Sequence, residues 1–203
     1  MSDSPGRLLL VRHGEIEANI RRLWHGSTDS ALTERGVSQA SRTAAHLARR
    51  EPRPAAIYAS PLQRTRNTAG AIADSLGLSL VLEPGLREFG IGELEGVSYE
   101  VLIREHRFFD KIFRDPGFAP PGGESMGQVV ARVSDALLRI ARAHPGQEAV
   151  VVGHGAALGF ALASLVNRDT SQWHREHLAN CALAELVLEP EPRILSWNTT
   201  EHL

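Results

Sequence analysis

The stretch Leu8-Leu9-Leu10-Val11-Arg12-His13-Gly14-Glu15 reads as an apolar strand that runs directly into Arg-His-Gly. A second apolar stretch, Ala149-Val150-Val151-Val152, runs into Gly153-His154-Gly155 in the same way. Each predicted strand therefore delivers a histidine to its carboxyl end. Because open α/β sheets bind ligands at that edge, the sequence predicts a site built around His13 and His154.

A third segment brings an arginine to the same kind of edge. Ser60-Pro61-Leu62-Gln63-Arg64 follows the apolar stretch 55–59, and we expect Ser60 to cap a helix with Pro61 at its first position. Arg64 then lies in the first turn, where the helix dipole disfavours a cation. An anion shared between its guanidinium and the backbone N–H groups explains that placement better than a structural role.

These segments belong to an ordered set that spans most of the chain. The set comprises Arg12-His13-Gly14-Glu15 with Asn19, Leu32-Thr33-Glu34-Arg35-Gly36, Ser60-Pro61-Leu62-Gln63-Arg64, Leu86-Arg87-Glu88 with Gly92-Glu93-Leu94-Glu95-Gly96, Gly122-Gly123-Glu124-Ser125, and Gly153-His154-Gly155. In this order it resembles the histidine phosphatase superfamily, in its phosphoglycerate mutase-like branch. Arg-His-Gly alone is a weak motif, whereas the ordered set is specific. Ala31 departs from the family, which often has proline there, but it lies at a turn.

The resemblance implies an α/β fold: a three-layer α/β/α sandwich with a mostly parallel central sheet and a small helical cap. It implies one domain over residues 1–203, with the cap at about 97–124. The implied catalytic residues are His13, Glu88, His154, Arg12 and Arg64. The implied substrate-binding residues are Arg12, Asn19, His25, Gly26, Arg64 and His154.

The chemistry implied is phosphoryl transfer through a covalent phosphohistidine on His13. One ring nitrogen must keep its proton, held by an acceptor such as a carbonyl in the Gly14 turn, so that the other can attack phosphorus. Fixed cations must neutralise the equatorial oxygens, and Arg12 and Arg64 can each donate two parallel hydrogen bonds. A protonated His154 would add a third donor. This arrangement requires no metal and no other cofactor.

An acid is expected from the glycine-rich stretch 83–96, which carries Glu88, Glu93 and Glu95. The family's pattern selects Glu88, and we expect the other two to be solvated or structural. Glu88 would protonate the leaving alkoxide and later deprotonate the attacking water. A bound phosphate should raise its pKa, because like charge disfavours the carboxylate.

The segment 98–121 is interpreted as a lid, with one helix predicted from Tyr99 to about Phe113. The alternative is a surface helix that simply buries its apolar side chains. Substrate selectivity is expected to come from residues 15–26 and 99–121. The tail from Asn198 is expected to be mobile.

Composition excludes several classes of partner. The 203 residues suit one domain, and 42% hydrophobic and 23% charged residues are ordinary for a globular protein. A net charge of −2 provides no field for nucleic acid or an anionic membrane. The single cysteine, Cys181, is expected to be a small buried hydrophobe. His174 and His177 have no nearby acid or cysteine, so we expect solvated or structural roles rather than metal binding.

The polar start 1–6 leads directly into the first strand, and no apolar run is long enough to span a membrane. We therefore expect a cytoplasmic protein that acts on a small-molecule phosphate ester. Three functions fit: a phosphatase for small phosphomonoesters, a mutase using the same phosphohistidine, and a binding module. The full catalytic set disfavours the binding module. The segment 96–122 is short for a mutase, which must exclude water, so we predict the phosphatase.

Overall fold

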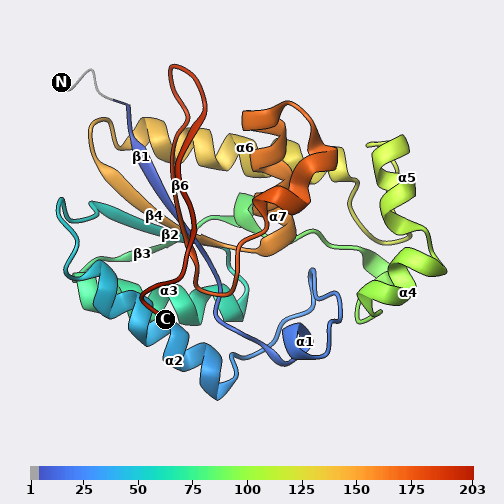
Figure 1. Ribbon diagram of the computed structural model, residues 1–203, viewed down its shortest axis with the longest axis horizontal. Coiled ribbons are helices and arrows are strands. Elements are labelled where there is room, and N and C mark those ends of the chain that lie inside the picture. The colour runs from blue at the N-terminus through green and yellow to red at the C-terminus, as the bar shows by residue number, and fades with distance from the viewer. Residues whose placement is uncertain (1–4) are drawn as a thin grey trace.

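A six-stranded sheet forms the middle layer of the molecule, with helices on both of its faces (Figure 1). The computed structural model describes residues 5–203 apart from the side chains of His174 and Glu176. Most of the polar start 1–6 therefore lies outside the described residues. The strand order is β3-β2-β4-β1-β5-β6. Strands β1 to β4 are mutually parallel, β5 is antiparallel to β1, and β6 is antiparallel to β5, which confirms the predicted, mostly parallel fold class. The strands are β1 (Arg7–Arg12), β2 (Ala56–Ala59), β3 (Leu80–Leu82), β4 (Glu148–Gly153), β5 (Leu183–Val187) and β6 (Arg193–Thr199).

The helices alternate with the strands along most of the chain. They are α1 (Glu17–Ile20), α2 (Glu34–Leu47), α3 (Gln63–Leu76), α4 (Tyr99–Arg104), α5 (Phe108–Arg114), α6 (Met126–Ala143) and α7 (Gly155–Leu162). The remaining helical segments are η1 (Pro84–Leu86), η2 (Gly92–Leu94), the π-helical η3 (Ala163–Asn167) and η4 (Thr170–Glu176). Among the described residues, none of these helices has both the length and the apolar character needed to cross a membrane.

Strand β1 is buried on both faces because its side chains alternate between two cores. Leu8 and Leu10 pack into the core that includes α6 and α7, and Leu9 and Val11 into the core that includes α2 and α3. Burial of each such side chain stabilises the fold by about 1.5–3 kcal/mol. Strands β1 and β4 pair in parallel register up to Arg12 opposite Gly153. The residues that follow, His13 and His154, therefore leave the sheet side by side.

Helix α3 begins later than the sequence predicts. Its first residue is Gln63 and its N-cap is Leu62, so the prediction that Ser60 caps it with Pro61 at the first position is wrong. The N–H of Gln63 instead donates to Asp29 Oδ1 at 2.8 Å. A carboxylate from the 15–30 loop thus satisfies the helix terminus, and Arg64 still lies in the first turn.

The lid segment forms two helices, so the single helix predicted from Tyr99 to about Phe113 is wrong. Helix α4 ends near Glu105, and Arg107 adopts a left-handed backbone conformation with φ +47°. That turn lets α4 bury Leu102 while α5 buries Phe108, both with no exposed surface. Figure 1 shows α4 and α5 together at the side of the molecule, away from the sheet.

Aromatic rings connect these two helices to the rest of the protein. The Trp24 ring lies 5.4 Å from that of Tyr99 and 5.8 Å from that of Phe108, between ring centroids. Phe109 stacks on Trp173 of η4, with centroids 5.6 Å apart and the planes 7° from parallel. Helices α4 and α5 are therefore held by apolar contacts with both the 15–30 loop and η4.

The tail is packed rather than mobile, contrary to expectation. Strand β6 extends to Thr199, and His202 Nε2 lies 3.1 Å from both Thr43 Oγ1 and the carbonyl oxygen of Cys181. Cys181 is fully buried, as predicted. The last residues consequently lie against α2.

Candidate functional site

His13 stands at the carboxyl end of β1 with only 3% of its surface exposed. Its Nδ1 lies 2.8 Å from the carbonyl oxygen of Gly14, the acceptor that the sequence predicted. A carbonyl can only accept, so Nδ1 carries the proton and Nε2 keeps its lone pair. Burial, followed by the charges of Arg12 and Arg64, lowers the pKa of His13 well below its usual 6.5. The ring is therefore neutral near pH 7.

Arg12 lies beside His13 and has a buried donor that is unused. Its Nη1 donates to the carbonyl oxygen of Leu178 at 2.8 Å and to His177 Nε2 at 3.0 Å, so His177 accepts here. The Nε atom is buried and has no hydrogen-bond acceptor among the described residues. A buried donor without an acceptor costs about 1–3 kcal/mol of free energy. An anionic ligand that accepts a hydrogen bond from this Nε would remove that cost. The side chain of His174 lies outside the described residues.

His154 is placed next to His13, with the two ring centroids 5.3 Å apart. Its Nδ1 accepts from Arg64 Nε at 3.2 Å, and its Nε2 lies 2.8 Å from Ser60 Oγ. Since Nδ1 accepts, the proton is on Nε2 and the ring is neutral. Burial, then the Arg64 charge, lowers the pKa of His154 well below 6.5. The suggestion of a protonated third donor is thus not met in this structure.

Arg64 has a structural role that the sequence argument considered less natural. It is fully buried, and its guanidinium donates to three main-chain carbonyls: Thr28 at 2.8 Å, His25 at 3.0 Å and Gly26 at 2.9 Å. Together with the bond to His154, these contacts fix the guanidinium between the loop and the floor of the site. Burial lowers the pKa of Arg64, with the Glu88 charge as the first opposing influence.

The 25–28 loop is also held from its other side. Glu95 accepts from the backbone N–H groups of Gly26 at 2.8 Å and Ser27 at 3.0 Å, and from Thr28 Oγ1 at 2.9 Å. Both backbone polar groups of Gly26 are therefore engaged within the protein. A Cβ at Gly26 would also collide with the carbonyl of Phe89, which explains the glycine. Glu95 has the structural role expected for it.

Asn19 is fixed by its side-chain oxygen. Oδ1 accepts from the N–H of Ile16 and from Asn180 Nδ2, each at 3.1 Å. This leaves the Nδ2 group of Asn19 as a donor that can face a ligand. Asn180 also donates to the main-chain carbonyl of His13 at 2.9 Å. Asn180 was not identified from the sequence.

Glu88 is 9% exposed and is anchored by the first turn of α7. Its Oε1 accepts from the N–H groups of Phe89 at 2.8 Å and Ala157 at 2.7 Å, and its Oε2 accepts from Ala156 at 3.1 Å. A carboxylate has about four lone-pair sites, so Oε2 retains one for a proton. The Glu88 charge opposes the lowering of the pKa of both Arg12 and Arg64 by burial. The three side chains therefore form one electrostatic cluster.

Arg132 of α6 holds the main chain around Glu88. Its Nη2 donates to the carbonyl of Glu88 at 2.9 Å, and its Nη1 to that of Gly85 at 2.9 Å. The guanidinium is oriented by Glu124, which accepts from Nε and Nη2 at 2.8 Å each. Glu124 lies in one of the segments that carry the family resemblance, whereas Arg132 was not identified from the sequence.

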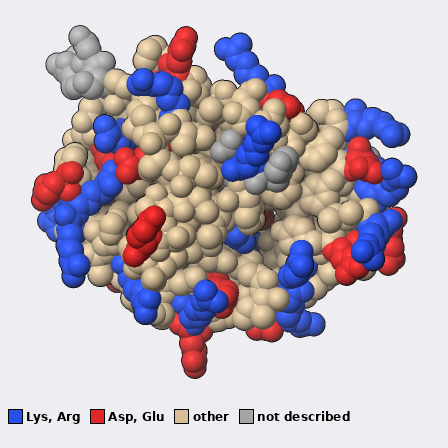
Figure 2. Space-filling view, viewed as in Figure 1, with Lys and Arg blue, Asp and Glu red and all other residues tan. Residues whose placement is uncertain are grey.

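The two segments expected to set selectivity meet in a groove of about 560 Å³. Arg21 and Arg22 contribute from the first segment, and Tyr99 and Arg104 from α4. Burial, followed by the Glu88 charge, raises the pKa of Tyr99 to about 12, so its phenol stays protonated. Figure 2 shows this face of the molecule hollowed between α7 and the α1 and α4 regions, with basic side chains around the hollow.

The structure thus brings the five predicted catalytic side chains into one buried cluster at the carboxyl edge of the parallel strands. A neutral histidine with a free Nε2, arginines beside it and an anchored carboxylate form a site suited to phosphoryl transfer. The sequence model of the histidine phosphatase superfamily (branch 1) matches residues 8–200. The chain belongs to the histidine phosphatase superfamily.

Its relatives carry more than one activity in their names. A protein of Erwinia tasmaniensis named "Probable phosphoglycerate mutase GpmB" is 34% identical over 94% of this chain and 88% of its own length. The phosphoserine phosphatase of Entamoeba histolytica, solved with 3-phosphoglyceric acid, has a TM-score of 0.86 at 28% identity, covering 98% of this chain and 99% of its own. Mycobacterial glucosyl-3-phosphoglycerate phosphatase, solved with VO3, has a TM-score of 0.83 at 26% identity, covering 96% and 99%.

Proposed function

We propose that this protein is a phosphatase that hydrolyses small phosphomonoesters through a phosphohistidine on His13. The observation that carries the proposal is the Nδ1 contact of His13 with the Gly14 carbonyl, which leaves Nε2 unprotonated. A neutral, oriented imidazole is the nucleophile that this reaction needs. The buried Nε of Arg12, which lacks an acceptor among the described residues, supports a phosphate position next to that ring.

In the first step, Nε2 of His13 attacks phosphorus and the bond to the ester oxygen breaks. Glu88 donates its Oε2 proton to the leaving alkoxide, which departs as an alcohol. Arg12 and Arg64 neutralise the charge on the equatorial oxygens, and the Asn19 amide adds a neutral donor. His154 orients the Arg64 side chain through its contact with Nε.

In the second step, water attacks the phosphohistidine and gives a proton to Glu88. The N–P bond breaks, inorganic phosphate leaves and His13 returns to its neutral form. Because the arginines supply the positive charge, the proposed reaction requires no metal. We further propose that residues 97–124, which include α4 and α5, act as the cap over the substrate.

The test combines turnover with capture of the intermediate. Wild-type protein should release phosphate from a panel of phosphomonoesters, and brief reaction with a ³²P-labelled substrate should leave acid-labile label on His13. His13→Ala should lose both signals. Glu88→Gln should slow an alkyl phosphate far more than an aryl phosphate such as p-nitrophenyl phosphate, whose leaving group needs no proton. Equal losses would argue against Glu88 as the acid, and absence of label during turnover would overturn the covalent route.

The relatives named phosphoglycerate mutase favour a second function, a phosphoryl isomerase that uses the same phosphohistidine. The cap segment supports hydrolysis, since α4 and α5 are only 6 and 7 residues long and a mutase must keep water from its intermediate. Incubation with 3-phosphoglycerate and catalytic bisphosphoglycerate distinguishes the two. We expect inorganic phosphate, and formation of 2-phosphoglycerate without phosphate release would establish the mutase instead.

A further inference from the structure

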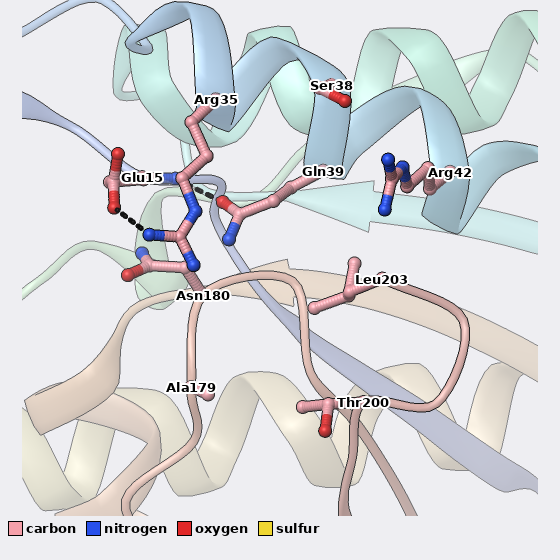
Figure 3. A pocket seen from close by; sticks show the side chains of 9 residues that line it. All are labelled: Glu15, Arg35, Ser38, Gln39, Arg42, Ala179, Asn180, Thr200 and Leu203. Atoms are coloured by element: carbon pink, nitrogen blue, oxygen red, sulfur yellow. Dashed lines mark hydrogen bonds and ion pairs between the residues drawn. The ribbon is translucent and has the colours of Figure 1, made fainter.

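A second cavity, of about 630 Å³, lies between α2 and the end of the chain. Arg35, Ser38, Gln39 and Arg42 of α2 form one wall, with Asn180 and Leu203 opposite them (Figure 3). None of the five side chains of the phosphoryl-transfer cluster lines it. Its size is typical of sites for small molecules.

Two arginines and one carboxylate, that of Glu15, line this groove, so its side chains carry a net positive charge. Arg35 and Arg42 are seven residues apart, so they project from the same face of α2 two turns from each other, on either side of Gln39 (Figure 3). Arg35 pairs with Glu15 at a distance of 3.4 Å between Nη1 and Oε2, but its side chain is 74% exposed and the pair is weak. The side chain of Arg42 makes no hydrogen bond or ion pair with any described residue.

Hydrogen-bond donors also outnumber acceptors in the groove. Gln39 uses Oε1 to accept from the N–H of Glu15 at 2.9 Å, so its NH₂ group remains available. The Ser38 hydroxyl and the guanidinium of Arg42 add further donors from the same helix face. Arginine forks combined with amide and hydroxyl donors match carboxylate and phosphate oxygens.

Two of the lining residues hold the main chain of the catalytic turn. Gln39 fixes Glu15, two residues beyond His13, and Asn180 donates to the carbonyl of His13 itself at 2.9 Å. Asn180 also bonds to Asn19, whose amide is a donor in the reaction proposed above. An anion bound by the free NH₂ group of Gln39 would therefore restrict the backbone at Glu15, close to the nucleophile.

We propose that this groove binds a small polyanionic metabolite, one with two or more carboxylate or phosphate groups, and that binding changes turnover at His13. The site is separate from the phosphomonoester pocket and goes beyond the proposed hydrolysis. Occupancy acts through Gln39, whose position it fixes and which holds the N–H of Glu15. A coupling between two such sites typically changes ligand affinity by about fivefold or more.

The binding test uses citrate as the probe and thermal unfolding as the readout. Citrate should raise the Tm of the wild type, and Arg42→Gln should lose most of that rise. Arg49→Gln is the matched control, because it removes the same charge just beyond the end of α2 without lining the groove. It should respond to citrate as the wild type does. An equal rise in all three proteins would overturn the site.

The coupling test measures p-nitrophenyl phosphate hydrolysis with and without citrate. Citrate that competes at the phosphate position raises only the apparent KM, whereas occupancy of the groove should change kcat in the wild type and in Arg49→Gln, but not in Arg42→Gln. A kcat that citrate leaves unchanged in the wild type would overturn the coupling. Turnover without citrate tests the proposed phosphatase separately, so the two failures are distinguishable.

Discussion

Nη2 of Arg132 donates a hydrogen bond to the main-chain carbonyl of Glu88 at 2.9 Å, between residues that are 44 positions apart in the sequence. The same side chain bonds to the carbonyl of Gly85, so it holds the segment that carries the proposed acid on its amino-terminal side. The first turn of α7 holds the carboxylate itself. Glu88 is thus positioned from two separate helices.

We expect Arg132→Gln to impair catalysis by displacing Glu88. A displacement of Glu88 by about 1 Å should lower kcat for an alkyl phosphate by about 100-fold. Hydrolysis of p-nitrophenyl phosphate should fall much less, because its leaving group needs no proton. Arg139→Gln on the same helix is the control, since Arg139 is largely exposed and pairs with Glu83. Equal losses with both substrates would indicate general unfolding instead.

Ser60→Ala should destabilise the fold. The substitution leaves the Nε2–H of His154 buried without its acceptor, at a cost of about 1–3 kcal/mol. Urea unfolding measures this change. Ser41→Ala, at an exposed position of α2, should change the free energy of unfolding by less than about 0.5 kcal/mol. A Ser60→Ala protein as stable as the wild type would show that His154 does not depend on this hydroxyl.

Gly155→Ala should weaken substrate binding. An added Cβ would lie 3.3 Å from Nε and Cζ of Arg12 and would push the guanidinium away from the proposed phosphate position. The KM for a phosphomonoester should rise about tenfold, which corresponds to one charge-assisted hydrogen bond. Steady-state kinetics measure it.

Gly70→Ala is the matched control for this change. Gly70 lies within α3, and a Cβ there meets nothing within 4 Å. The variant should keep its KM and gain about 0.5–1 kcal/mol of stability, since alanine favours a helix over glycine. An unchanged KM in Gly155→Ala would mean that Arg12 can shift without losing the ligand.

Stability should fall in acid because two histidines are held neutral in the fold. Burial and neighbouring arginine charges lower the pKa of both His13 and His154 well below 6.5. The unfolded chain therefore binds protons that the folded chain does not. As the pH falls below about 6.5, each histidine should remove up to about 1.4 kcal/mol of stability per pH unit.

Urea unfolding of the wild type and His13→Asn, at about pH 7.5 and about pH 5.5, measures this linkage. The variant should lose less stability between the two conditions, because one of the rings with a lowered pKa is gone. Identical losses would contradict a depressed pKa at His13.

The sequence predicted what depends on local pattern. Apolar runs set the ends of β1 and β4, and parallel pairing then places His13 and His154 together, so both could be located without coordinates. The Gly14 carbonyl was predictable for the same reason, because it belongs to the adjoining residue. Arg64 was correctly placed in a first helical turn, although the cap itself was assigned wrongly.

The contacts that were missed are tertiary ones. Ser60 meets His154 across 94 positions, and Asn180 meets His13 across 167. Serine is a favourable N-cap residue, so the local sequence predicted a helix cap at Ser60. That prediction was wrong because a buried histidine competes for its hydroxyl. The break at Arg107 could not be predicted for a similar reason. Nothing in the local sequence favours a left-handed backbone at this arginine, and only packing against the aromatic core requires it.

The aromatic seating of α4 and α5 has a consequence for how this scaffold could diversify. Ring packing depends on shape and tolerates many different charges on the opposite, solvent-facing side. The solvent-facing residues of the two helices, including Arg104 and Lys111, can therefore be substituted without disturbing His13 or its partners. A protein engineer could graft a new recognition surface there and keep the reaction centre intact.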